Sequence, residues 1–395
     1  MTGHYLHSTE ANTHGGMPPF LRKALILGGV MLWFSSPVMA QSELRPGFDA
    51  AEYRELLRVF QAQFGVQWPG GDRSPADTVR PSTIGKPEQY SFDYLSAEAG
   101  MRNRWALWLR RDHRVAAILL RGTVGDPVSW LENFYAGQAP ANGAFQLNDS
   151  VRFEYRLAAD DRAMVHAGWL IGLASLAPSI VARIKSEYAQ GVHAFILFGH
   201  SQGAALAFLA RSYLYYLQQK GALPADIVFK TYCSAAPKPG NAYYAYDYDF
   251  ITRGGWGLTV VNAADWVPET PFSLQTMGDL NPVNPFANID KTLARMSAIK
   301  RLYIKGKYNK LRRRARKAAT AFRKVLGNMA GVRVRKALPE LQEPVLGPGM
   351  NYQRAGTPVV LEPDSAYYRL FPRHTQQVFE HHRLEAYDWL TAKYY

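Results

Sequence analysis

The sequence predicts an α/β fold in which a mostly parallel central sheet is flanked by helices. Apolar runs of strand length alternate along the chain with segments of helical spacing, which is the pattern of strands joined by crossover helices. The clearest strand is 194–200, an apolar run expected to be buried on both faces. A glycine-rich turn joins it to 204–216, which is rich in alanine and leucine and favours helix.

The remaining elements follow from periodicity and from turn residues. Before the central strand we expect, in chain order, a helix over 50–64, a loop over 69–87, an antiparallel hairpin over 105–110 and 114–121, a short amphipathic piece over 125–137 and a long helix over 165–189. After it we expect strands over 227–234 and 258–262, a late strand pair over 352–361 and a terminal helix over 375–393.

The first 40 residues resemble a targeting segment rather than part of the fold. Arg22 and Lys23 precede the apolar run 24–34, which is too short to cross a bilayer as an ordinary helix, and a small residue, Ala40, ends the segment. This order is typical of a secretory signal peptide over 1–40, with an uncleaved anchor as the alternative. We therefore expect an exported protein, periplasmic or secreted, whose folded domain is 41–395.

The charge of the chain is concentrated in one segment. Residues 291–336 hold 17 lysines and arginines and no acidic residue, so subtracting them from the formal net charge of +14 leaves −3 for the rest. Cys233 is the only cysteine, which excludes an intrachain disulfide and a metal site built from several cysteines.

The turn at 199–203 has the G-x-S-x-G pattern of a nucleophile elbow. The strand before it and the helix after it would lift Ser201 above the end of the sheet, and glycines flank the serine because a Cβ there would collide with both. A serine hydroxyl is a poor nucleophile at neutral pH, so it needs a base within hydrogen-bond reach and an acid behind that base. We interpret Ser201 as a catalytic nucleophile.

The acid should follow the serine along the chain and stand at the end of a strand. Asp265 comes shortly after the strand 258–262, so we expect its carboxylate beside the elbow; a helix or turn cap is its alternative role. The other acids considered in this part of the chain are Asp247, Asp249 and Glu269.

Three histidines follow Asp265 and are candidates for the general base: His374, His381 and His382. His382 is our first candidate, and His381 and His374 are the alternatives. We expect His381 and His382 in the first turns of the terminal helix. A surface histidine without a catalytic role is the competing interpretation for each.

Six motifs occur in order along the chain: LLRGT followed by SWLENF, VHAGWL, FGHSQGAA, SAAPKPGN, VVNAADWVP and a weaker HHRLEAY. In this order they resemble the motifs of the class 3 lipases, the group that includes the fungal triacylglycerol lipases. The resemblance covers roughly 105–271 and 352–387, and it identifies the chain as an exported bacterial member of that family.

The resemblance implies an α/β-hydrolase fold and cleavage of lipid esters through an acyl-serine intermediate. It makes Ser201 the nucleophile, Asp265 the orienting acid and His382 the base. The backbone N–H groups of Thr123 and Gln202 would bind the oxyanion, with the Thr123 hydroxyl as a further donor. This chemistry needs no metal and no cofactor.

Triacylglycerol is the substrate that the resemblance suggests first. A phospholipase A1 or a carboxylesterase acting at anionic membranes is the alternative. An alternative of another class is a catalytically inactive protein that binds lipid surfaces.

The resemblance also places a lid at 125–137, whose apolar side would cover the site in water and open at an oil surface. That apolar side consists of Trp130, Leu131 and Phe134. A histidine of the VHAGWL motif, His166, matches a position that we interpret as structural. The chain departs from the family pattern at four positions: Gln202 stands where leucine is commonest, Ala204 where glycine is usual, and Ser129 and Asn133 where another polar pair is usual.

The segment 278–350 lies between acid and base and outside the resemblance. It should contain two helices, and the second combines an apolar line from Leu311 to Met329 with a basic face. Basic amphipathic helices are typical of membrane surfaces. We expect 290–336 to contact an anionic membrane or lipid surface, with a solvated face over a docked helix as the alternative. Nucleic acid is not an expected partner, because an exported enzyme rarely meets it and no base-stacking module accompanies the charge.

Overall fold

The computed structural model describes residues 43–65, 84–373 and 376–395. The predicted signal peptide, most of the predicted loop 69–87 and the candidate base His374 lie outside these residues. The described part of the chain belongs to one compact unit, Ser42–Tyr395.

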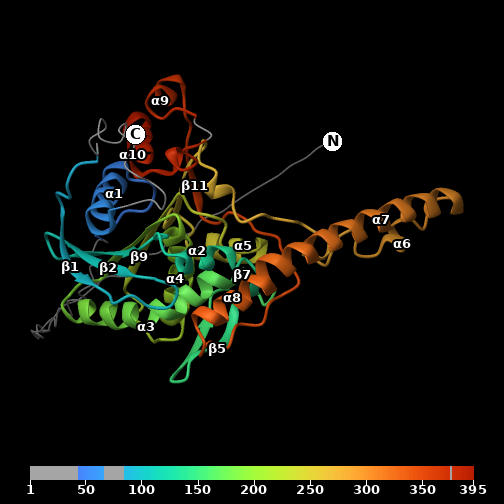
Figure 1. Cartoon of the computed structure of the whole chain (residues 1–395), viewed down its shortest axis with the longest axis horizontal. Helices are drawn as coiled ribbons and strands as arrows, with labels where there is room; N and C mark the ends of the chain where they lie inside the picture. Colours follow the sequence, from blue (N-terminus) through green and yellow to red (C-terminus); the bar gives the residue numbers. More distant parts are fainter. Residues whose placement is uncertain (1–42, 66–83, 374–375) are drawn as a thin grey trace, which may run out of the picture. The chain divides into compact units, whose positions relative to one another are not determined.

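A seven-stranded sheet forms the centre of this unit, with strand order β1-β2-β3-β8-β9-β10-β11 (Figure 1). Strands β1 to β3 are antiparallel, and β3, β8, β9, β10 and β11 run parallel to one another. The seven strands are β1 (Tyr90–Leu95), β2 (Trp105–Arg110), β3 (Val115–Leu120), β8 (Ala194–His200), β9 (Val228–Ser234), β10 (Gly257–Asn262) and β11 (Thr357–Leu361). The predicted hairpin and central strands are confirmed, and the architecture is a mostly parallel α/β sheet.

The strand register brings the chemistry-bearing segments to one edge of the sheet. Leu120 at the end of β3 pairs with Gly199, and His200 at the end of β8 pairs with Ser234 at the end of β9. Because parallel strands end at the same edge, Ser201 and the segment after β10 leave the sheet on the same side.

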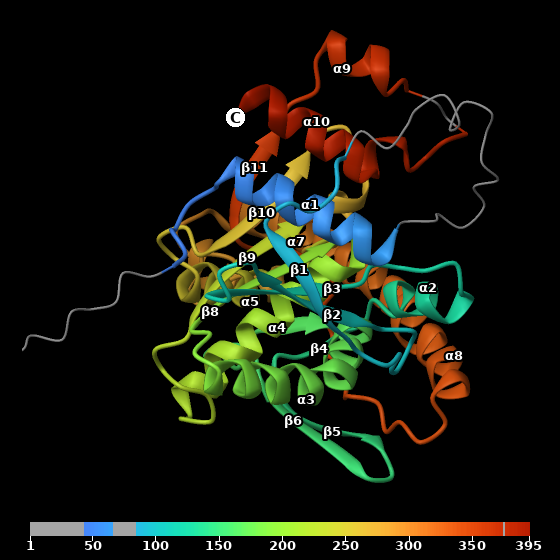
Figure 2. The same cartoon turned by 90° about the vertical axis from the view of Figure 1, so that its left-hand side faces the viewer.

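Helices cover both faces of the sheet (Figure 2). Along β3, alternate side chains face opposite sides: Ile118 packs in the core with α3 (Ala167–Ala189) and α4 (Gln202–Gln219), whereas Leu119 packs in the core with α1 (Ala50–Phe64) and α10 (Leu384–Tyr394). By length and composition α3 would qualify as a membrane span, but 67% of its apolar window is buried, as in the core helix of a globular domain.

Two predictions near the C-terminus are wrong. The late strand pair is the single strand β11, because the residues before it make only an isolated bridge, between Gln353 and Gly240. His381 and His382 lie in a 3₁₀ turn, η4 (Glu380–His382), and not in the first turns of α10. The helix begins only after Arg383, whose backbone is extended with φ −71° and ψ 148°.

Several short elements were not predicted from the sequence. They are β4 (Gln138–Pro140) with β7 (Met164–His166), the hairpin β5 (Asn142–Asn148) and β6 (Val151–Arg156), α5 (Ala242–Ile251), the 3₁₀ turns η1 (Val267–Glu269) and η2 (Met277–Asp279), and α9 (Ser365–Leu370). The edge strand β1 was also missed, since it is exposed at three of its six residues and lacks a continuous apolar run.

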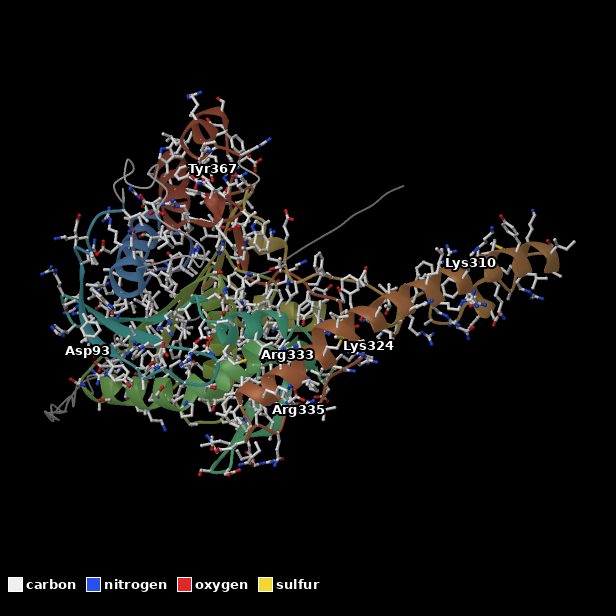
Figure 3. All side chains as sticks on the ribbon, in the orientation of Figure 1. Asp93, Lys310, Lys324, Arg333, Arg335 and Tyr367 are labelled. Carbon is white, nitrogen blue, oxygen red and sulfur yellow. The ribbon has the colours of Figure 1, made fainter. Side chains whose placement is uncertain are left out.

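The insertion 278–350 is mainly helical and mainly exposed. It contains α6 (Ile289–Thr292), α7 (Ala298–Arg323), the π-helical turn η3 (Lys324–Met329) and α8 (Ala330–Ala337). Within the 26 residues of α7 only Tyr308 and Ala319 are buried. The helix extends away from the sheet (Figure 1), and side chains such as Lys310 project from it (Figure 3). The predicted helix with the apolar line from Leu311 to Met329 lies within α7 and η3. Leu311, Val325 and Met329 of that line are exposed, whereas Phe322 and Leu326 are half-buried.

Candidate active site

The turn between β8 and α4 has the geometry of a nucleophile elbow. Ser201 has φ 61° and ψ −129°, a strained conformation for a residue with a side chain. A Cβ on Gly199 would lie 2.1 Å from the Gly203 carbonyl oxygen, and one on Gly203 would lie 2.0 Å from the Leu120 carbonyl oxygen. Glycine is therefore required on both sides of the serine because strand, turn and helix approach too closely for a side chain.

Asp265 and His382 form a buried pair at the edge of the sheet that carries the elbow. The His382 Nδ1–H donates to Asp265 Oδ2 at 2.6 Å, and both side chains have no solvent exposure. Asp265 also accepts from the Tyr387 hydroxyl at 2.8 Å and from the Val267 N–H at 3.0 Å. Burial raises the pKa of Asp265, but His382 and these hydrogen bonds outweigh burial and hold the pKa below its ordinary value.

His200, which directly precedes Ser201, holds His382 beside the elbow. Its Nε2–H donates to the His382 carbonyl oxygen at 2.8 Å, and the two rings lie 4.7 Å apart. Since a carbonyl oxygen only accepts, His200 Nδ1 must be the acceptor toward the Ser234 hydroxyl, 3.0 Å away. Ser234 in turn accepts from the Tyr53 hydroxyl at 2.6 Å. Burial lowers the pKa of His200 to about 3, so its ring stays neutral.

His381, Asp247 and Asp249 contact groups other than the Asp265–His382 pair. Nδ1 of His381 lies 2.9 Å from the Tyr367 hydroxyl and not against Asp265. Asp247 accepts from the Tyr216 hydroxyl, and Asp249 accepts from the Gly356 N–H. Of the histidines in the described part of the chain, His382 is therefore the one whose ring is hydrogen-bonded to Asp265.

His166 is the N-cap of α3, consistent with the structural role predicted for it. Its Nδ1 accepts from the Trp169 N–H, and its Nε2–H donates to the Asn133 carbonyl oxygen at 3.2 Å. Burial lowers the pKa of His166 to about 3.

Thr123 and Gln202, the predicted oxyanion donors, contact each other through their side chains. The Thr123 hydroxyl donates to Gln202 Oε1 at 2.8 Å, and Asn133 Nδ2 donates to both of these oxygens at 2.9 Å. The N–H of Gln202 is the first of α4 and has no partner within the helix, as is general at helix N-termini. The Thr123 hydroxyl, which we expected to face the substrate, is directed at Gln202.

The predicted lid corresponds to α2 (Pro127–Phe134), which buries polar rather than apolar residues. Ser129 and Glu132 face inward, whereas Phe134 is 57% exposed. The Trp130 ring lies 6.1 Å from that of Phe379. Phe379 in turn lies 6.0 Å from the His382 ring, and Trp266 flanks it at 5.4 Å. Aromatic side chains from three segments thus lie around the buried histidine.

The parallel sheet with a serine elbow after β8 and a histidine–aspartate pair at the same edge defines the α/β-hydrolase fold. Residues 117–275 match the family model described as "Lipase (class 3)". By this match, the segment that contains the elbow and Asp265 belongs to the class 3 lipase family. His382 and the insertion lie outside the matched residues.

Solved structures of fungal lipases resemble the chain over part of its length. A Rhizomucor miehei lipase propeptide complex is 18% identical with a TM-score of 0.37, over 57% of this chain and 65% of that one. A triacylglycerol lipase from Penicillium expansum is 18% identical with a TM-score of 0.37, over 57% of this chain and 75% of that one. A comparison with curated proteins finds no match.

Proposed function

We propose that this protein is a serine hydrolase that cleaves carboxylic esters of lipids. The observation that carries the proposal is the buried hydrogen bond between His382 and Asp265 beside the elbow of Ser201. Since a carboxylate only accepts, this bond keeps the proton on Nδ1 of His382 and makes Nε2 the basic nitrogen.

The reaction would run in two halves. The Ser201 oxygen attacks the ester carbonyl carbon while His382 Nε2 takes its proton, and the carbonyl oxygen becomes an oxyanion. The intermediate collapses to an acyl-serine, and the departing alcohol takes the proton from His382. Water then repeats the sequence and releases the carboxylic acid. The N–H groups of Thr123 and Gln202 would bind this oxyanion. Each such donor typically stabilises the transition state by about 2.7–4 kcal/mol.

A lipid substrate is supported by the family match and by the surface around the site. Trp266, whose ring lies 5.4 Å from that of Phe379 beside the buried histidine, is 42% exposed. Val378, whose carbonyl oxygen accepts from the Trp266 indole N–H, is 54% exposed. Triacylglycerol is our first substrate, and a phospholipid or a soluble carboxylic ester is the alternative.

The test compares hydrolysis of emulsified triolein, phospholipid micelles and a soluble short-chain ester by the wild-type protein and Ser201→Ala. We expect Ser201→Ala to keep less than about a hundredth of the wild-type rate on every substrate that is cleaved, with an unchanged thermal unfolding transition. The substrate cleaved fastest selects among the three classes. Equal rates for the two proteins would contradict the proposal, and vesicle binding without turnover would favour the inactive lipid-binding protein.

We also propose that 290–336 contacts an anionic lipid surface and that the protein reaches it by export through the leader 1–40. Three large side chains near the start of α7, Ile299, Leu302 and Tyr303, are 84%, 74% and 65% exposed. They precede a stretch of exposed lysines and arginines. Among the described residues, the ion pairs of this segment are Lys305–Asp290 and Arg335–Glu343. Exposed apolar side chains beside excess positive charge fit an anionic membrane surface.

A further inference from the structure

The side chain of Gln202 is buried directly behind the predicted oxyanion donors. It is 2% exposed, and its two polar atoms face different partners. Oε1 accepts from the Thr123 hydroxyl and from Asn133 Nδ2, and Nε2 donates to Asn103 Oδ1 at 3.4 Å. Since an amide can be turned by 180° at little steric cost, something must decide which atom faces Thr123.

One end of this arrangement is a donor that cannot accept. The indole N–H of Trp169 donates to Asn133 Oδ1 at 3.0 Å. Because an indole nitrogen only donates, Asn133 must present its oxygen to Trp169 and its Nδ2 to Gln202 and Thr123. Asn133 Nδ2 then faces the Thr123 oxygen, so the proton of the Thr123 hydroxyl is left to point at Gln202 Oε1.

The other end is a carboxyl group. Glu132 is fully buried, and its Oε2 accepts from Asn103 Nδ2 at 2.6 Å. Because Trp169 fixes Asn133 and Asn133 fixes Gln202, Gln202 presents Nε2 to Asn103, so Asn103 presents Oδ1 to Gln202 and Nδ2 to Glu132. Burial raises the pKa of Glu132 to about 8, against the effect of the Asn103 and Gln202 amides, which favour the charged form.

The fold makes room for this carboxyl at Gly172 of α3. A Cβ there would lie 2.3 Å from Glu132 Oε1 and 3.1 Å from Asn103 Nδ2. The proposed lipid-ester hydrolysis does not require a carboxyl at this place, and a buried carboxyl is costly. Its burial among amides therefore calls for a role.

We propose that Glu132 and Trp169 are positioning residues for the oxyanion-binding end of the site. They terminate a one-way hydrogen-bond relay, Trp169–Asn133–Gln202–Asn103–Glu132, which fixes the Gln202 carboxamide and through it Thr123. Every bond in the relay runs from the indole donor toward the carboxylate acceptor. This inference rests on the proposed function, because it assigns the relay to the two residues whose N–H groups would bind the oxyanion.

The test is Glu132→Gln on the ester that the wild-type protein cleaves. Glutamine has nearly the same shape, but its amide can donate as well as accept, so the accepting end of the relay is no longer fixed and Trp169 alone sets the direction. If the Asn103 amide turns by 180°, it presents Nδ2 to Gln202, and Gln202 must turn to offer Oε1. Gln202 Nε2 then faces Asn133 Nδ2, so two donors face each other. We expect kcat to fall about tenfold with KM unchanged, because the loss concerns transition-state stabilisation.

A compensating change separates positioning from general damage. In the double variant Glu132→Gln with Asn103→Asp, Gln at 132 donates to the new carboxylate, which still accepts from Gln202 Nε2. The direction at Gln202 is restored, and kcat should return to within about twofold of wild type. Glu55→Gln removes another buried carboxylate, which accepts from the N–H groups of Glu88 and Gln89, and should leave kcat unchanged.

The outcomes distinguish the two proposals. Wild-type kcat in Glu132→Gln, or a loss that Asn103→Asp does not recover, overturns the relay. If Glu132→Gln does not fold, Trp169→Phe removes the donor end instead, and unchanged kcat in that variant overturns it. Absence of Ser201-dependent turnover in the wild-type protein contradicts the proposed function itself.

Discussion

In the body of the chain, the side chains of β3, β8 and β10 are all buried, whereas in the insertion 278–350 the 26 residues of α7 bury only two. The charges are divided in the same way, because 291–336 carries all of the excess positive charge. A packed region can hold polar groups at fixed hydrogen-bond distances, as at Asp265 and His382. An exposed helix can present charge and apolar side chains to a surface but cannot hold a catalytic geometry. The proposed chemistry and the proposed surface contact thus belong to different regions.

The two regions meet at the end of α2. A Cβ on Gly137 would lie 3.2 Å from the Cα of Gly327 in the insertion, and a Cβ on Gly331 would lie 3.2 Å from the Tyr135 ring. The Tyr352 hydroxyl, just after the insertion, donates to the Ala136 carbonyl oxygen at 2.9 Å. The inner end of the insertion is therefore packed against the segment that follows Glu132 and Asn133, while its outer part is exposed.

The largest expected effect is the loss of ester hydrolysis when His382 is replaced, with no change in the insertion. His382→Ala should lower kcat/KM by at least about 10³-fold, because the proposed general base is lost. His381→Ala should lower it by less than about tenfold, since His381 contacts Tyr367 and not Asp265. Both variants should bind vesicles like wild type. The assignment of the base is contradicted if His381→Ala causes the larger loss.

The second prediction concerns changes in α7 that should weaken vesicle binding without changing ester hydrolysis. Replacing four exposed bases on one face of α7 by glutamate should weaken binding to vesicles containing anionic lipid by roughly three orders of magnitude at low salt, at about 1 kcal/mol per base. The four are Lys310, Arg313, Arg314 and Lys317. Turnover of a soluble short-chain ester should not change.

In a matched control, four exposed basic residues outside the insertion are replaced by glutamate. They are Lys86, Lys185, Lys220 and Arg253. If vesicle binding falls equally in the α7 variant and in this control, total charge rather than the insertion determines binding. Vesicle binding that is indifferent to the α7 changes contradicts the proposed contact.

The smallest expected effect concerns the pH dependence of the free energy of unfolding, which should depend on a buried histidine of the body and not on the insertion. The pKa of His166 is about 3 in the folded protein and about 6.5 when unfolded, so between these values only the unfolded chain binds the proton. The free energy of unfolding should therefore fall as the pH is lowered, by about 1.4 kcal/mol per pH unit for this one group. Urea unfolding of His166→Asn between pH 6 and pH 4 should show a slope smaller by about that amount.

The insertion supplies the control for this slope. Residues 291–336 contain no histidine and no carboxylate, so Lys300→Met should leave the slope as in wild type. A slope in His166→Asn equal to that of wild type would show that His166 is not held neutral by burial.

The sequence was sufficient to predict the elbow turn, the central strands and the position of Asp265 after β10, because each depends on local pattern and chain order. The hydrogen bonds that hold His382 could not be predicted. Tyr53 and Ser234 are 181 residues apart in the chain, and nothing local indicates their contact. The inward face of α2 was predicted incorrectly, because Glu132 is buried by amide partners that the helical periodicity does not reveal.

The most direct test of the central claim is covalent labelling with a fluorophosphonate, followed by identification of the modified residue by mass spectrometry. We predict one modified residue, Ser201, in the wild-type protein, no label in Ser201→Ala and labelling slowed by at least about 10²-fold in His382→Ala. Labelling of another residue, or labelling of Ser201 at an equal rate without His382, would contradict the account.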